Sequence, residues 1–150
     1  LAGERTPHNN VRASGSFIGL RHEHDRAALA YAVMEGVTLG LMDGASSLQS
    51  GQGTQTDWAL VGGGAQSDVW AQMLASGFVR PMVRYSSAHA AGALGAARLA
   101  WLADGGNEAD VCAVRGAAHR FEPVAAESAH LQERFSRFVG LYPAVVDQFV

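Results

Sequence analysis

Lysine is absent from this chain of 150 residues, and each of its eleven cationic side chains is an arginine. A phosphate-binding loop of the Walker A type needs a lysine that reaches the phosphates, so that kind of nucleotide site is excluded. A Schiff base on lysine is excluded for the same reason. The formal net charge of -3 disfavours a polyanionic partner, and we expect no binding of nucleic acid.

Cysteine is nearly absent too, because Cys112 is the only one. A single thiol can form neither an intrachain disulfide nor a cysteine-based zinc site. We expect Cys112 to be free and buried, in a protein of the reducing cytoplasm. Long uncharged apolar runs and the pattern of a signal peptide are also missing, so we expect no contact with a membrane. Since the first residue is Leu1, we expect a fragment or a processed chain.

The first half of the chain predicts one long helix over residues 25–50, with Asp25 as its N-cap. An apolar stripe recurs at four-residue spacing and is formed by Leu29, Val33, Val37 and Leu41. Glycines repeat at the same spacing, at Gly36, Gly40 and Gly44. Because glycine weakens a helix, the three together predict that another backbone packs closely on that face.

The second half alternates short strands and helices. We expect a buried strand over 58–61, a helix from Ser67 to about Gly77, a strand over 82–85 and a helix over 89–103. This order predicts a parallel α/β unit, with the alanine-rich helix packed closely on the sheet. Residues 104–122 are expected as a loop and 125–140 as a last helix. The inward-facing residues of the second half are predicted as Trp70, Met73, Leu74, Trp101, Leu131, Phe135 and Phe138.

Three successive glycines, Gly62, Gly63 and Gly64, separate the predicted strand at 58–61 from the helix that Ser67 begins. Without Cβ atoms they let a ligand approach the backbone, and their N–H groups with the helix N-terminus form a partially positive site suited to phosphate or ribose. Such turns also occur for packing reasons alone, and both interpretations remain open. The spacing is not the G-x-G-x-x-G of dinucleotide-binding domains, and the acidic residue expected after the second strand is missing.

Other clusters are explained by local structure. His22-Glu23-His24-Asp25 places neighbouring side chains in different directions, so it predicts a capped helix start and no metal site. In the loop at 3–8, Glu4 and Arg5 could pair with each other, or Arg5 could hold an anion. Cys112 has no placed partners for a nucleophile.

Several segments in succession resemble xylulokinases of the FGGY family of carbohydrate kinases, and the likeness covers about residues 1–142. They are Gly3-Glu4-Arg5-Thr6-Pro7-His8 with Gly15-x-Phe17-x-Gly19-Leu20, the helix at 24–37, Gly62-Gly63-Gly64-Ala65-x-Ser67-x-x-Trp70, and Ala93-Leu94-Gly95-Ala96-Ala97. The resemblance implies an α/β fold of the ribonuclease H-like, actin-like ATPase class. Residues 1–150 would be the C-terminal lobe, incomplete at its N-terminal strands.

The resemblance also implies a kinase that transfers the γ-phosphate of ATP to a hydroxyl of a ketopentose. D-xylulose is the favoured substrate, and Mg-ATP is the cofactor. The expected nucleotide-binding residues are Gly62, Gly63, Gly64, Ala65, Ser67 and Asp68. Gly63, Gly64 and Ala65 would back the α-phosphate and ribose, and Asp68 would lie near the adenine. The general-base aspartate and most sugar contacts would lie outside the chain, which alone should be inactive.

Three positions depart from the family pattern. His89 stands where an acidic residue is common, Gly92 stands where proline or alanine is usual, and Asp68 adds a negative charge that should repel ATP. A catalytically silent regulatory or interaction domain that kept the fold is therefore the alternative. A homodimer through apolar residues of the last helices also remains open.

Overall fold

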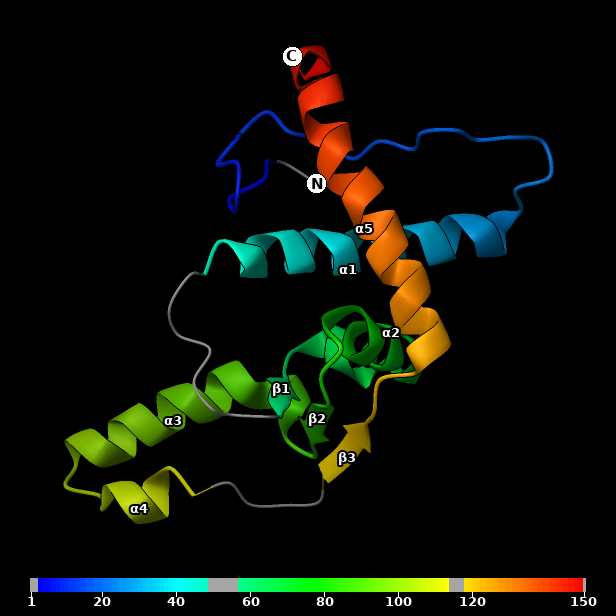
Figure 1. Ribbon diagram of the computed structural model, residues 1–150. Coiled ribbons are helices and arrows are strands. Elements are labelled where there is room, and N and C mark those ends of the chain that lie inside the picture. The colour runs from blue at the N-terminus through cyan, green and yellow to red at the C-terminus, as the bar shows by residue number, and fades with distance from the viewer. Residues whose placement is uncertain (1–2, 49–56, 114–117, 150) are drawn as a thin grey trace. The chain divides into compact units, whose positions relative to one another are not determined.

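The computed structural model describes residues 3–48, 57–113 and 118–149. The chain divides into two compact units, which are described one at a time. The first, here called the helical unit, comprises Leu1–Thr54 and Val124–Val150, and the second, the sheet unit, comprises Gln55–Pro123 (Figure 1). None of the described helices is long and apolar enough to cross a membrane.

The helical unit is built on α1 (Arg26–Ser46) and α5 (Ala125–Val145), which pack against each other. Asp25 caps α1 as expected, since its Oδ1 accepts a hydrogen bond from Ala28 N at 2.8 Å. The helix ends at Ser46, earlier than predicted, and the expected residues 49–50 lie outside the described part of the chain. The last helix is longer than predicted and continues through the 3-10 turn Val146–Gln148. Its predicted inward residue Leu131 is fully buried.

The predicted apolar stripe of α1 is wrong, because Val33, Val37 and Leu41 are 52%, 43% and 48% exposed. The buried face of α1 instead carries Glu35, Thr38, Leu39, Met42 and Asp43. The ion pair between Glu35 and Arg134 of α5 lies on this buried face, where α1 meets α5.

The glycine face of α1 is also more open than predicted. A Cβ added at Gly44 would lie 3.5 Å from the backbone oxygen of Thr6, so the expected close backbone is present there. At Gly40 the nearest atom is in the Phe138 ring, at 3.9 Å, and at Gly36 nothing lies within 4 Å. A backbone packed along all three glycines is therefore not found.

The sheet unit contains three strands in the order β1 (Trp58–Leu60), β2 (Met82–Tyr85) and β3 (Ala118–Phe121). β1 and β2 are parallel, as predicted, with Trp58 opposite Met82 and Leu60 opposite Arg84. β1 is half-buried to exposed rather than buried.

The prediction of a loop over 104–122 is wrong, because this region holds the short helix α4 (Glu108–Val111) and β3, which is antiparallel to β2. Arg120 of β3 forms ion pairs with Asp57 and Glu122, and Asp57 directly precedes β1. Asp57 lies far from Arg120 in the sequence, and Glu122 lies just outside β3, so no pattern within the strand itself predicts it. Cys112 follows α4 and is exposed, which corrects the expectation that it is buried.

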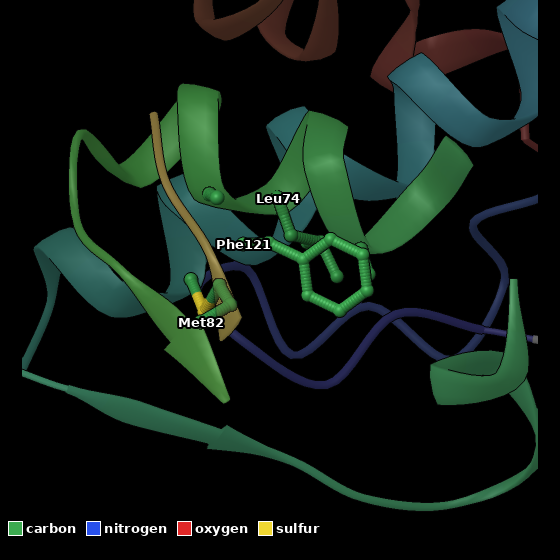
Figure 2. Close-up of a cluster of buried hydrophobic side chains, with 5 residues drawn as sticks. Leu74, Met82 and Phe121 are labelled. Atoms are coloured by element: carbon green, nitrogen blue, oxygen red, sulfur yellow. The ribbon is translucent and has the colours of Figure 1, made fainter. Parts of the chain in front are cut away.

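The core of the sheet unit lies between α2 (Asp68–Phe78) and the strands. Figure 2 shows the side chains of Leu74, Met82 and Phe121 directed toward one another. Ala71 and Ala75 complete the buried cluster, and the half-buried side chains packed against it belong to Trp58, Leu60, Trp70 and Phe78. The predicted inward positions of Met73 and Leu74 are confirmed.

The predicted helix over 89–103 is present as the 3-10 turn Ala88–Ala90 followed by α3 (Ala91–Ala103). Its predicted close packing is wrong, because no residue of α3 is buried and Trp101 is 55% exposed. A recess of about 550 Å³ is lined both by α3 residues and by residues of the strands. Alanine and glycine permit close packing but bring little apolar surface to drive it.

Candidate functional site

The glycine turn joins β1 to α2 and is held at its first residue. Gly62 has a φ of +90°, a conformation that favours glycine, and its N–H donates to the carbonyl of Ala88 at 2.8 Å. A 3-10 turn over Gly63–Gln66 follows. Ser67 then caps α2 as predicted, because its hydroxyl accepts a hydrogen bond from Trp70 N at 3.3 Å.

The three glycines have three different surroundings. Gly62 is explained by its backbone conformation. Gly64 is explained by packing, because a Cβ there would lie 2.2 Å from Cζ3 of Trp70. At Gly63 no atom lies within 4 Å of an added Cβ, and its φ is not in the left-handed region. Neither of these two constraints calls for glycine at position 63, where the backbone is open to approach from outside the chain.

Part of the polar backbone of the turn is already engaged internally. Gly62 N binds Ala88 O, while Ala65 N and Ser67 N donate back to Gly62 O and Gly64 O at 3.3 and 3.1 Å. The donors of the turn that could meet a phosphate are therefore those of Gly63 and Gly64, beside the N-terminus of the eleven-residue helix α2.

Asp68, in the first turn of α2, has a close cationic partner in Arg84. Arg84 Nη1 lies 2.7 Å from Asp68 Oδ1 and donates a second hydrogen bond to the carbonyl of Ala65 at 2.9 Å. The expected repulsion of ATP by Asp68 is therefore reduced, since an adjacent opposite charge offsets its field. Sequence reasoning missed Arg84; the one available signal was a cationic residue on the strand parallel to β1, opposite its last residue.

The recess beside α3 reaches the turn, because Val61 and Ala88 contribute to its lining. Val61 precedes Gly62, and Ala88 accepts the Gly62 N–H. The volume, about 550 Å³, is within the range of small-molecule sites. The turn thus borders a space that can hold a ligand of nucleoside size.

The other sequence clusters are structural. His24 Nδ1 accepts a hydrogen bond from Arg21 N at 3.0 Å next to the Asp25 cap, which confirms the interpretation as a helix start. In the N-terminal loop, Glu4 binds the backbone of His8 at 2.9 Å rather than Arg5. Within the described ranges no group of three metal-ligating side chains comes together.

Comparison with known proteins decides the family. The profile of the FGGY family of carbohydrate kinases, C-terminal domain, matches residues 1–103, well over half of the chain. The chain belongs to this family.

The relatives of this FGGY chain include xylulose kinases and a gluconate kinase. The xylulose kinase of Escherichia coli K12 is 45% identical over 103 residues, which are 69% of this chain and 21% of that protein. The structure of a ligand-bound xylulose kinase from Lactobacillus acidophilus matches with a TM-score of 0.81 and 28% identity, over 99% of this chain and 30% of that one. A gluconate kinase from the same organism matches with a TM-score of 0.80, 28% identity and the same coverage.

These structures confirm the ribonuclease H-like fold class of the FGGY chain, whose small mixed sheet is a partial C-terminal lobe. The chain spans between about a fifth and a third of the length of these relatives. The glycine turn lies inside the matched region, as do Asp68 and Arg84.

Proposed function

We propose that residues 1–150 are the C-terminal, nucleotide-side domain of an ATP-dependent sugar kinase. The complete protein would transfer the γ-phosphate of ATP to a hydroxyl of a ketopentose, with D-xylulose favoured over D-gluconate. The 45% identity to a xylulose kinase supports the pentose, although a gluconate kinase structure is matched about as well as a xylulose kinase structure.

The observation that carries the proposal is the open backbone at Gly63. A nucleotide phosphate or ribose could rest directly against this backbone, because no protein atom lies within 4 Å of the position that a Cβ would take. Phosphoryl transfer depends mainly on positioning and on neutralising charge, so a rigid wall for ATP is a direct contribution.

Each predicted site residue then has a proposed role. Gly62 gives the turn its conformation, Gly63 meets the nucleotide, and Gly64 makes room for the Trp70 ring. Ser67 caps α2 beside the site. The other two predicted residues, Ala65 and Asp68, are the partners of Arg84.

The divalent metal that accompanies ATP neutralises phosphate charge during transfer. The described residues fit the nucleotide better than the metal, because they offer a backbone cradle but no cluster of carboxylates. Mg²⁺ would thus be held by the nucleotide and by the part of the kinase outside this chain. The general-base aspartate is proposed to lie there too, so the isolated chain should not turn over sugar.

The test compares two glycine substitutions in the complete protein. The first is Gly63→Val, where no atom lies within 4 Å of an added Cβ, and Gly140→Val in α5 is the matched control, since nothing lies within 4 Å of its added Cβ either. We expect Gly63→Val to raise the Kd of ADP by about tenfold or more in calorimetry, and Gly140→Val to change it by less than about twofold.

The alternative is a catalytically silent regulatory or interaction domain. Absence of ADP binding by the unaltered protein, or an unchanged Kd in Gly63→Val, would favour it. If ADP binds as expected, coupled assays with D-xylulose and D-gluconate identify the sugar.

We also propose a cellular location and an oligomeric state for the complete protein. A cytoplasmic location is supported by the single free thiol, Cys112. A homodimer is supported by exposed apolar side chains of the later helices such as Trp101 and Leu99. Light scattering on the complete protein, which reports its mass in solution, tests the dimer.

A further inference from the structure

Arg84 stands between the core of the sheet unit and the glycine turn. Its side chain is 21% exposed, and its guanidinium carbon lies 5.3 Å from the centre of the Phe121 ring. Phe121 belongs to the buried cluster, so the guanidinium is supported from the sheet side by an aromatic face.

Arg84 Nη1 donates two hydrogen bonds, one to a residue before the N-cap Ser67 and one to the residue after it. One goes to the carbonyl of Ala65 in the 3-10 turn at 2.9 Å, and the other to Asp68 in the first turn of α2 at 2.7 Å. Both turns are thereby connected to β2, which carries Arg84.

The bond to Ala65 also fixes the orientation of a peptide plane. A trans peptide points its C=O and the following N–H in opposite directions, so a carbonyl held by Arg84 directs the next N–H away from it. Together with the bond from Gly62 N to Ala88 O, this contact anchors the turn at both ends. Gly63 and Gly64 lie between the two anchors.

We infer that Arg84 is a positioning residue of the nucleotide site: it holds the Ala65 carbonyl, and with it the glycine turn, in the shape that receives ATP. The inference rests on the proposed function of that turn. Arg84 also offsets the charge of Asp68, and this second effect must be separated from the first.

Charge and position can be separated with a double-substitution cycle in the complete protein. Arg84→Met keeps an unbranched stem but loses the charge and both hydrogen bonds, and Asp68→Asn removes only the acidic charge. If Arg84 served only to neutralise Asp68, the double variant would bind ADP as Asp68→Asn does. If Arg84 positions the turn, the double variant stays weak.

We expect Arg84→Met to raise the Kd of ADP about tenfold, as for the loss of a charge-assisted hydrogen bond. Asp68→Asn gives the effect of the acidic charge alone, and the double variant should remain at least about fivefold weaker in ADP binding than Asp68→Asn. In steady-state kinetics the KM for ATP should rise, while kcat and the KM for the sugar should change by less than about twofold.

Hydrogen exchange without nucleotide supplies a readout that does not depend on binding. Arg84→Met should speed exchange of the amides at 65–70, where the turn is held, and leave the amide of Leu131 in α5 unchanged. If Arg84→Met does not fold, Arg84→Leu, which also has no hydrogen-bond donor, is used with the same expectations.

The outcomes distinguish the inference from the proposed function. An unaltered protein that does not bind ADP overturns both, whatever the exchange rates are. An unaltered protein that binds ADP, with a Kd unchanged in Arg84→Met or restored in the double variant to that of Asp68→Asn, keeps the nucleotide site and overturns the positioning role.

Discussion

The ring of Trp70 occupies the space in front of Gly64. A Cβ added at Gly64 would lie 2.2 Å from Cζ3 of that ring, and real Cβ atoms essentially never approach other atoms closer than 3.0 Å. Packing within the sheet unit therefore favours glycine at position 64, because any larger residue would displace the Trp70 ring. Because Gly63 has no such neighbour, the two adjacent glycines can be separated by experiment.

Gly64→Ala should lower the free energy of unfolding by about 1–3 kcal/mol, because the methyl group forces the Trp70 ring to move. Gly63→Ala should change it by less than about 0.5 kcal/mol. Urea unfolding of the two variants measures the difference. Introducing Trp70→Ala should remove most of the cost of Gly64→Ala, and a cost that persists would contradict the steric explanation.

Loss of Arg134 should destabilise the helical unit. Its Nε lies 2.6 Å from Oε1 of Glu35, whose side chain is only 5% exposed, in an ion pair that lacks the alignment of a hydrogen bond. Arg134→Met leaves this carboxylate buried without its close cation, and we expect a loss of about 2 kcal/mol, since Arg134 itself is half exposed.

The control is the exposed pair of Arg137 and Glu133, at the similar distance of 2.7 Å within α5. Arg137→Met should cost less than about 0.5 kcal/mol in thermal or urea unfolding. Equal losses in the two arginine variants would show that burial of Glu35 does not matter.

Stability should fall at alkaline pH because of Tyr31. Burial raises the pKa of Tyr31 above its usual 10.0, and the carboxylates of Glu35 and Glu127 raise it further. The folded state therefore holds the phenol proton more tightly than the unfolded state. Its contribution to stability is complete below pH 10.0 and is lost as the pH rises through the higher folded pKa.

Tyr31→Phe should remove this part of the pH dependence. The measurement is the free energy of unfolding between about pH 8 and pH 12, with phenolate absorbance followed in parallel. Identical slopes for the variant and the unaltered protein would rule out Tyr31 as the source.

Cys112 should react with a thiol reagent in the folded protein. It lies at the end of the short helix α4 and is exposed. We expect labelling without denaturant, located by mass spectrometry at Cys112 and abolished in Cys112→Ser. Labelling that appears only after unfolding would contradict the exposed position.

Much of the local structure could be predicted because its causes lie within a few residues. Asp25 and Ser67 accept hydrogen bonds from amides three residues ahead, so a polar residue before a helical pattern is enough to locate the caps. The alternation of strand and helix predicted the parallel pair β1 and β2. Motifs in the family's order indicated FGGY kinases, and the family match confirmed them.

The failures involve partners that are distant in the sequence. The buried face of α1 meets α5 through contacts such as that of Glu35 with Arg134, almost a hundred positions away, and four-residue spacing of apolar residues gave no sign of it. β3 depends on pairing with β2 and on Arg120 meeting Asp57, which is 63 residues earlier. A short strand with polar residues has no periodicity strong enough to predict it alone.

The sequence by itself determined where α1, α2 and α5 begin, the order of β1 and β2, and the family with its glycine turn, because local hydrogen bonding and motif spacing are written in neighbouring residues. Only the tertiary structure decided which constraint applies at Gly64 and that Asp68 is paired. Those outcomes depend on the Trp70 ring and on Arg84, which reaches residues 16 and 19 positions away. Such contacts exist only once the strands have paired and the core has formed.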